Sequence, residues 1–273
     1  MQRRAQAERA RGRTIALVPT MGYLHEGHLS LLREGRRRGD LLALSIFVNP
    51  TQFGPTEDLE RYPRDPEGDL AKARACGVDL AFLPEAVDMY RPGAQTFVEV
   101  RELAQPLCGR TRPGHFAGVA TIVAKLFHLC QPQVALFGEK DYQQLAIVRR
   151  MVRDLDFPVE IVGMPIVREP DGLALSSRNA YLSPDERTRA LALSRGLEAA
   201  RARLRAGERD GARLSEAARS ILAPAATRID YVELRDAEAL VEVARLDPGA
   251  RAVLLAAAFF GRTRLIDNAI LRG

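Results

Sequence analysis

The stretch TIALVPTMGYLHEGHLSLL, Thr14–Leu32, decides the fold. It opens on a short apolar run that stops at Pro19 and Gly22, which is typical of a buried strand feeding a loop. Leucines at helical spacing follow the loop, and Gly39 provides a stop signal for that helix. A second apolar run, Leu41–Val48, predicts a strand that is buried on both faces. Strand, helix and strand within about 35 residues form a βαβ unit with parallel pairing and a right-handed crossover.

The alternation of strand and helix continues as far as Val167. Helices are expected at Pro66–Cys76, Phe116–Leu129 and Tyr142–Leu155, and strands at Val78–Leu83, Gln133–Phe137 and Val159–Val167. This alternation predicts an α/β fold with a doubly wound parallel sheet, a Rossmann-like nucleotide-binding domain over residues 1–167. Ligands of such sheets bind at the carboxyl ends of the strands.

The character of the sequence changes after about Val167. Ser183–Leu222 is rich in Ala, Arg, Leu and Glu and is expected to be helical, with a weak point at Gly207. Strands are expected at Ile229–Leu234 and Arg251–Phe260. Residues 168–273 therefore predict a smaller α+β domain.

The composition is that of a soluble globular protein, because 47% of the 273 residues are hydrophobic and 27% are charged. No apolar run reaches the roughly 18 residues that a membrane helix needs, so no membrane partner is expected. The polar, Arg-rich start lacks the apolar core of a secretory signal, which favours a cytoplasmic protein. The cysteines are odd in number without CxxC spacing, which predicts thiols in a reducing compartment at Cys76, Cys108 and Cys130.

The net charge is +5, but the basic residues are scattered along the chain. Because the sequence has neither zinc-finger spacing nor an RNP-type aromatic motif, a solvated Arg-rich surface explains the charge better than nucleic-acid binding does. Of the 40 basic residues only three are lysines, at 72, 125 and 140. A lysine retained in such an arginine-rich chain suggests a need for a compact, mobile ammonium, which marks Lys140 as a candidate site residue.

The segment PTMGYLHEGH, Pro19–His28, holds two of the four histidines and allows three interpretations. Zinc is the first, although His25 and His28 have i, i+3 spacing rather than the i, i+4 of HExxH, and only His115 could supply a third imidazole. Two ordinary surface histidines are the second. The third places both imidazoles at a helix N-terminus and at the carboxyl edge of a strand, where backbone N–H groups and the helix dipole attract phosphate.

The context favours the phosphate interpretation. Gly22 and Gly27 remove side chains where a ligand could approach the backbone. The loop contains neither GxxxxGK[ST] nor GxGxxG, so it fits neither a P-loop kinase nor an ordinary dinucleotide enzyme. Donors placed against phosphate oxygens stabilise the charge that develops in phosphoryl transfer. The segment therefore predicts chemistry at an α-phosphoryl group.

Six motifs, in order, carry a resemblance to a known family. HEGH resembles the HxGH signature of the nucleotidyltransferase superfamily, but the match extends much further. The motifs are PTMGYLHEGH, FVNPTQFG (Phe47–Gly54), YPRD (Tyr62–Asp65), RPGHFAGVATIVAKLF (Arg112–Phe127), FGEKDYQQL (Phe137–Leu145) and DGLALSSRNAYL (Asp171–Leu182). Together they resemble the pantothenate synthetase (pantoate–β-alanine ligase) family from residue 14 onward, with only a weak match in the last hundred residues.

The resemblance implies a reaction. The family joins D-pantoate to β-alanine at the expense of ATP, through an enzyme-bound pantoyl adenylate, and releases pyrophosphate and then AMP. ATP is thus a substrate, and Mg²⁺ is expected with it, held mainly by phosphate and water with Asp69 as a conjectural carboxylate ligand. A homodimer is the family's habit.

The resemblance also implies ATP-binding residues. They are Met21, Gly22, Tyr23, Leu24, His25, Glu26, Gly27, His28, Gly138, Glu139, Lys140, Asp141, the backbone of Val167, and the loop Leu175, Ser176, Ser177 and Arg178. In this set His25 and His28 face the phosphates, with His28 at the proton-donor position, and Lys140 stabilises the leaving group. The loop is the counterpart of KMSKS and closes over the triphosphate.

D-Pantoate is expected to contact two amide side chains, since an amide can bond hydroxyl and carboxylate groups at once. These are Gln52 and Gln144, with Asn49 and Tyr62 lining the same region. Arg112 and His115 fall near the site without an assigned role.

Simpler interpretations exist for several of these residues: a surface ion pair for Lys140, helix capping for Ser176 and Ser177, and ordinary surface glutamines. Two other functions also stay open. One is a nucleotidyltransferase with a stable nucleotide conjugate as its product. The other is a nucleotide-binding module without turnover.

Overall fold

The computed structural model describes residues 1–55 and 57–273 and divides the chain into two compact units. The N-terminal unit contains Met1–Glu139 and Gln143–Pro165, and the C-terminal unit contains Lys140–Tyr142 and Ile166–Gly273. The main division thus lies close to the boundary expected after Val167, but the short segment Lys140–Tyr142 belongs to the second unit.

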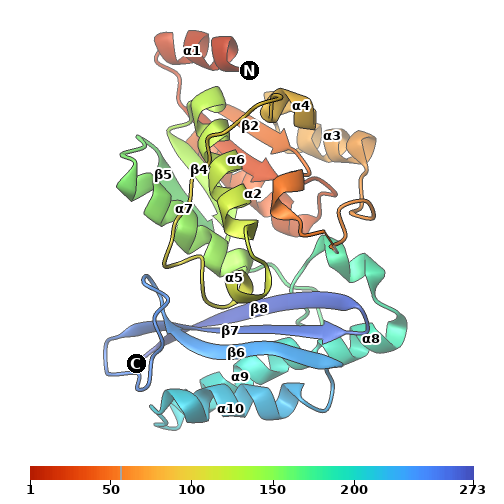
Figure 1. Ribbon diagram of the computed structural model, residues 1–273, viewed down its shortest axis with the longest axis vertical. Helices are drawn as coiled ribbons and strands as arrows, with labels where there is room; N and C mark the ends of the chain where they lie inside the picture. Colours follow the sequence, from red (N-terminus) through yellow and green to blue (C-terminus); the bar gives the residue numbers. More distant parts are fainter. Residues whose placement is uncertain (56) are drawn as a thin grey trace. The chain divides into compact units, whose positions relative to one another are not determined.

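A parallel sheet forms the centre of the N-terminal unit (Figure 1). Its strands are β1 Ile15–Thr20, β2 Leu41–Ile46, β3 Leu80–Phe82, β4 Val134–Gly138 and β5 Glu160–Met164, in the order β3-β2-β1-β4-β5. All four neighbouring pairs are parallel, which confirms the predicted doubly wound sheet. The order runs outward from β1 in both directions, so the topological switch point lies between β1 and β4, where ligands of such sheets bind.

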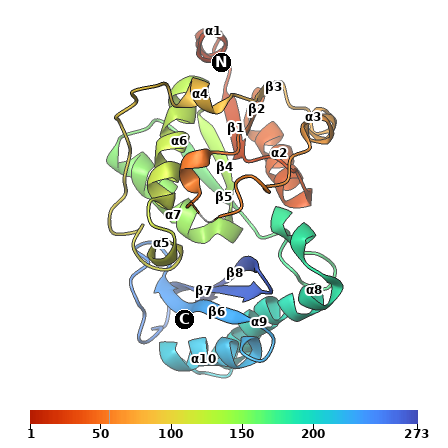
Figure 2. The same cartoon turned by 45° about the vertical axis from the view of Figure 1, so that its right-hand side comes forward.

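Helices cover both faces of this sheet. The helices of this unit are α1 Gln2–Ala10, α2 Glu26–Arg38, α3 Pro66–Ala75, α4 Ala86–Met89, α5 Cys108–Thr111, α6 His115–Cys130 and α7 Tyr142–Asp154. Figures 1 and 2 show α2 and α3 on one face and α6 on the other. The first five residues of β2 are buried, as its unbroken apolar run predicts.

The C-terminal unit is a three-stranded antiparallel sheet with helices. Its strands are β6 Arg228–Asp236, β7 Arg251–Phe260 and β8 Thr263–Arg272, in that order, and its helices are α8 Pro184–Ala190, α9 Ala192–Arg205 and α10 Gly211–Leu222. The expected helical region is thus broken twice, at Leu191 and around Gly207, which has φ +97°. The sequence did not predict β8, because buried polar residues at Asp267 and Asn268 interrupt its apolar pattern.

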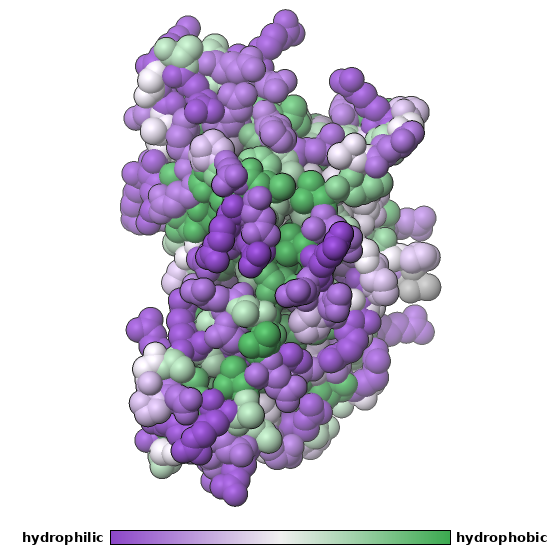
Figure 3. Space-filling view, turned by 60° about the vertical axis from the view of Figure 1, so that its left-hand side comes forward, coloured by the Kyte–Doolittle hydropathy of each residue, from purple (hydrophilic) through white to green (hydrophobic). Residues whose placement is uncertain are grey.

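Hydrophilic side chains predominate on the face shown in Figure 3, in keeping with the Arg-rich surface inferred from composition. Within the part of the chain that the structure describes, none of the helices combines the length and the apolarity needed to cross a membrane.

The cysteines give a test of the core. Cys130 at the end of α6 has no exposed surface, and burial raises the pKa of its thiol to about 12, whereas Cys76 is half-buried. At pH 8 only on the order of one Cys130 thiol in 10⁴ is a thiolate, the reactive form. We therefore expect a disulfide reagent to label Cys76 first and Cys130 only on unfolding, as measured by peptide mass spectrometry. Cys76→Ser should remove the early label, and rapid labelling of Cys130 in the folded protein would contradict this packing.

Candidate active site

The loop after β1 ends in two hydrogen bonds in which histidine rings accept backbone N–H groups. His25 is the N-cap of α2, with extended backbone (φ −126°, ψ 175°). The backbone N–H of Gly27 donates to Nδ1 of His25 over 3.2 Å, and the N–H of His25 donates to Nδ1 of His28 over 3.3 Å. The two rings lie 4.1 Å apart between centroids. The structure thus confirms that both imidazoles stand at a helix N-terminus.

These bonds determine which ring nitrogens carry protons. An imidazole nitrogen that accepts a hydrogen bond has no proton of its own, so in both rings Nδ1 is unprotonated and Nε2 bears the hydrogen. In this tautomer each ring presents Nε2–H as a donor. Because they stand at the first turn of the 13-residue helix α2, the helix dipole adds to their attraction for an anion.

The zinc interpretation required His115 as a third ligand. His115 instead lies in a network with Arg112 and the backbone of Gln52. Across residues 1–55 and 57–273, no group of three or more His, Cys, Asp and Glu side chains is arranged to hold a metal ion.

Helix α3 anchors the loop that leads to the histidines. The carboxylate of Asp69, which is 1% exposed, accepts the N–H of Tyr23 over 2.8 Å and that of Leu24 over 2.6 Å. One turn later, Lys72 donates to the carbonyl of Leu24 over 2.9 Å. Asp69 and Lys72 thus hold both polar groups of the Leu24 backbone, a role that sequence reasoning missed.

Two consecutive loop residues have left-handed backbone, Gly22 with φ +83° and Tyr23 with φ +53°. A Cβ on Gly22 would lie 3.0 Å from both Oδ2 of Asp69 and Cγ2 of Ile46, so the turn has neither the conformation nor the space for a side chain. The glycine predicted to allow a close approach is therefore required by the loop itself. Further along, Glu26 lies on the exposed side of α2 and pairs with Arg33.

The segment after β2 presents Gln52 on a short 3-10 helix, η1 (Pro50–Gln52). Asn49 caps it by accepting the backbone N–H of Thr51 over 3.4 Å. Its side-chain oxygen also accepts the hydroxyls of Thr51 and Tyr90 over 3.0 and 2.9 Å, and its amide donates to the carbonyl of Gly118 over 3.1 Å. These bonds explain why Asn49 is only 1% exposed. Its predicted contact with D-pantoate stays a prediction.

Arg112 and His115 hold Gln52 from α5 and α6. The carbonyl of Gln52 accepts Nδ1–H of His115 over 2.8 Å and a guanidinium N–H of Arg112 over 3.2 Å. Arg112 also donates to Nε2 of His115 and forms a bidentate pair with Glu57, at 2.7 and 2.6 Å. The two residues left without a role in the sequence thus fix the backbone of a predicted substrate-binding residue.

The other predicted residues of this unit are also located. Gln144 is half-buried on α7, next to Gln143, which is 4% exposed and bonds Leu103, Pro106 and Cys108. Tyr62 is 6% exposed and meets Phe53 edge-on. Gly138 and Glu139 follow β4 directly. Since β2, β1 and β4 are adjacent and parallel, the segments that follow them lie at one edge of the sheet.

The remaining predicted residues belong to the C-terminal unit. Lys140 and Asp141 lie in the 3-10 helix η2 (Glu139–Asp141), and the carbonyl of Val167 accepts the N–H of Leu175 over 3.0 Å. Ser176 caps the 3-10 helix η3 (Ser177–Tyr181) by accepting the N–H of Arg178 over 3.3 Å. Helix capping is therefore one role of Ser176, and phosphate binding by the loop stays a prediction.

Comparison with known proteins identifies the family of this chain. The family model described as Pantoate-beta-alanine ligase matches residues 1–270. The chain belongs to this family. A pantothenate synthetase from Anaeromyxobacter dehalogenans is 64% identical, with 98% of this chain and 94% of the relative aligned. The chain is therefore an enzyme.

Solved structures of family members agree with the fold. Pantothenate synthetase from Thermus thermophilus superposes with a TM-score of 0.91 at 49% identity, covering 97% of this chain and 96% of that one. The pantoate-beta-alanine ligase from Francisella tularensis was solved in complex with beta-gamma ATP and beta-alanine. It gives a TM-score of 0.77 at 31% identity, covering 97% and 94%.

The support that α3 gives to the loop can be tested by stability. Asp69→Ala is expected to lower the free energy of unfolding by at least about 2 kcal/mol, because a part-buried N–H group at Tyr23 and a buried one at Leu24 lose their acceptor, at roughly 1–3 kcal/mol each. Urea denaturation measures the change. Glu67→Ala, an exposed carboxylate in the same turn of α3, is the control and should change stability by less than about 0.5 kcal/mol. Parental stability with a changed Mg²⁺ dependence would instead support Asp69 as a metal ligand.

Proposed function

We propose that the chain joins D-pantoate to β-alanine at the expense of ATP, through a pantoyl adenylate. The observation that carries the proposal is the pair of imidazoles, His25 and His28, whose Nδ1 atoms accept backbone N–H groups at the N-terminus of α2, beside the topological switch point. Family membership supplies the substrate class, and the ligands of the Francisella tularensis enzyme support it.

The first half-reaction suits such a site. A carboxylate oxygen of D-pantoate attacks the α-phosphorus of ATP, and the bond from that phosphorus to the bridging oxygen of pyrophosphate breaks. Negative charge grows on the phosphate oxygens, where preorganised donors are most effective. His25 and His28 are proposed to donate there, with His28 at the proton-donor position. Lys140 and the loop Leu175–Arg178 are proposed to stabilise the leaving pyrophosphate.

The second half-reaction needs orientation more than a protein nucleophile. The amine of β-alanine attacks the acyl carbon of the mixed anhydride, the bond to AMP oxygen breaks, and the amide of pantothenate forms. Gln52 and Gln144 are proposed to hold the pantoyl hydroxyl and carbonyl groups. The backbone of Gln52 is well placed for this role because Arg112 and His115 restrain its carbonyl.

Mg²⁺ is proposed to accompany ATP, where it would neutralise phosphate charge. Both oxygens of Asp69 already accept backbone N–H groups, and the side chain is buried. Asp69 therefore fits the role of a metal ligand poorly. Phosphate and water oxygens are the proposed ligands of Mg²⁺. A homodimer, which the family resemblance implies, and a cytoplasmic location, which the N-terminal sequence favours, stay predictions.

Product analysis tests the reaction. The protein is incubated with ATP, Mg²⁺, D-pantoate and β-alanine, and AMP, ADP and pantothenate are assayed. We expect AMP and pantothenate together, and only when both acid and amine are present. ADP would indicate a kinase and overturn the adenylate route. ATP binding without turnover would favour a nucleotide-binding module.

Individual roles are tested by single-turnover formation of pantoyl adenylate. His28→Ala is expected to fold normally and slow this step at least about tenfold, because one preorganised donor is lost, while ATP affinity changes less. The matched control is His128→Ala, which removes an exposed imidazole on α6. Equal rates in His28→Ala and parent would refute the assignment.

A further inference from the structure

Strand β8 carries two adjacent buried polar residues that the reaction described above does not use. Asp267 is 2% exposed and Asn268 is 4% exposed. Neighbouring residues of a strand point to opposite faces, so their side chains leave β8 on different sides. Burying a carboxylate and an amide is costly unless both are bonded, so the partners of these two groups are informative.

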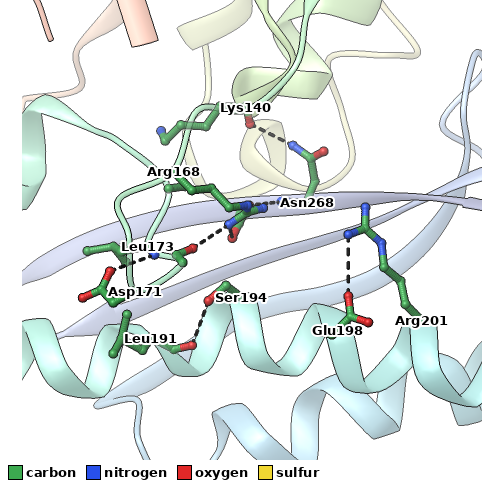
Figure 4. Close-up of polar contacts among 12 residues, drawn as sticks. Lys140, Arg168, Asp171, Leu173, Leu191, Ser194, Glu198, Arg201 and Asn268 are labelled. Carbon is green, nitrogen blue, oxygen red and sulfur yellow. Dashed lines mark hydrogen bonds and ion pairs between the residues drawn. The ribbon is translucent and has the colours of Figure 1, made fainter. Parts of the chain in front are cut away.

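Asn268 holds the segment that contains Lys140. Its side-chain amide donates to the carbonyl of Lys140 over 3.0 Å, and Figure 4 shows the two groups facing each other while the Lys140 side chain extends away. A second bond holds the same segment: the hydroxyl of Tyr142 donates to the carbonyl of Ala237, the residue after β6, over 2.9 Å. The C-terminal unit thus fixes the backbone of Lys140 and leaves its ammonium to reach elsewhere.

Asp267 holds the turn that leads into the Leu175–Arg178 loop. It forms a bidentate pair with Arg168, at 2.7 and 2.8 Å, and Arg168 also donates to the carbonyl of Gly172 over 3.0 Å. The turn closes through an antiparallel bridge between Arg168 and Ala174. The buried carboxylate of Asp267 therefore holds Arg168, which in turn closes the turn.

The restraint continues from the turn into η3. Asn179 of η3 donates to the carbonyl of Ala174 over 3.1 Å and to the carboxylate of Glu169 over 3.2 Å. A continuous series of bonds therefore runs from Asp267 through Arg168 and the turn to the 3-10 helix that carries Arg178.

We propose that Asp267 and Asn268 are positioning residues that hold Lys140 and the Leu175–Arg178 loop on one strand, so that the two phosphate-binding segments act as a single body. The proposal rests on the nucleotide roles given above to these segments. Groups that act on the same triphosphate must keep their mutual geometry to within a fraction of an ångström. Two neighbouring residues of a rigid strand provide that constraint for segments separated by more than thirty residues of chain.

The test uses two isosteric substitutions. Asp267→Asn keeps the shape of the side chain but removes the charge that pairs with Arg168. Asn268→Asp keeps the shape but replaces the donor to the Lys140 carbonyl with an acceptor, which repels it. Asp230→Asn is the matched control, because Asp230 is a buried carboxylate paired with Arg264 between β6 and β8 of the same sheet.

The readout is pantoate-dependent exchange between ATP and pyrophosphate, together with thermal stability. For Asp267→Asn and Asn268→Asp we expect kcat/KM for ATP to fall at least about tenfold while KM for D-pantoate changes less than about twofold. Asp230→Asn should lower the melting temperature without a selective effect on ATP. Parental kcat/KM for ATP in both variants, or the same selective loss in the control, would overturn the proposal.

Two further variants separate a failure of the nucleotide role of Lys140 from a failure of the positioning role of β8. Lys140→Ala is measured beside these variants: an unchanged rate would refute the nucleotide role of Lys140 itself, whereas a slow Lys140→Ala with normal β8 variants refutes only the positioning by β8. If Asp267→Asn does not fold, Arg168→Lys replaces it, because a lysine keeps the charge but cannot form the bidentate pair. The same selective loss for ATP is then expected.

Discussion

The carboxylate of Asp69 is the group on which the histidine site depends. The chain leaves β1 through two successive residues with left-handed backbone, Gly22 and Tyr23. This conformation is unfavourable for Tyr23, because it carries a side chain. Asp69 offsets that cost by accepting the N–H groups of Tyr23 and Leu24, and Lys72 takes the carbonyl of Leu24. The direction in which the chain enters α2 therefore follows from contacts with α3.

That direction determines the chemistry of the two imidazoles. Because His25 enters α2 in an extended conformation, its ring can cap the N–H of Gly27 while its own N–H reaches His28. The tautomers are consequently set by the protein before any ligand arrives. A site of this kind does not reorganise when charge develops on a phosphate, which is the condition under which electrostatic stabilisation is strongest.

Local patterns predicted much of this molecule. Apolar runs and leucine spacing located β1, α2 and β2, and the long apolar segment located α6. In these elements the pattern of apolar residues along the sequence matches the pattern of buried residues. Contacts between distant residues were not visible in the sequence. Strand β8 was missed because Asp267 and Asn268 interrupt its apolar pattern, and the side-chain bonds that these two residues make to Arg168 and Lys140 join positions far apart along the chain. The roles of Asp69, Arg112 and His115 were missed for the same reason.

The most direct test of the account is the protonation of the two imidazoles, measured by two-bond ¹H–¹⁵N NMR at pH 8 with and without a non-hydrolysable ATP analogue. We expect Nδ1 to be unprotonated and Nε2 to be protonated in both His25 and His28, and both Nε2–H resonances to shift when the nucleotide is added. A proton on Nδ1 in either ring, or resonances that do not respond to the nucleotide, would contradict it.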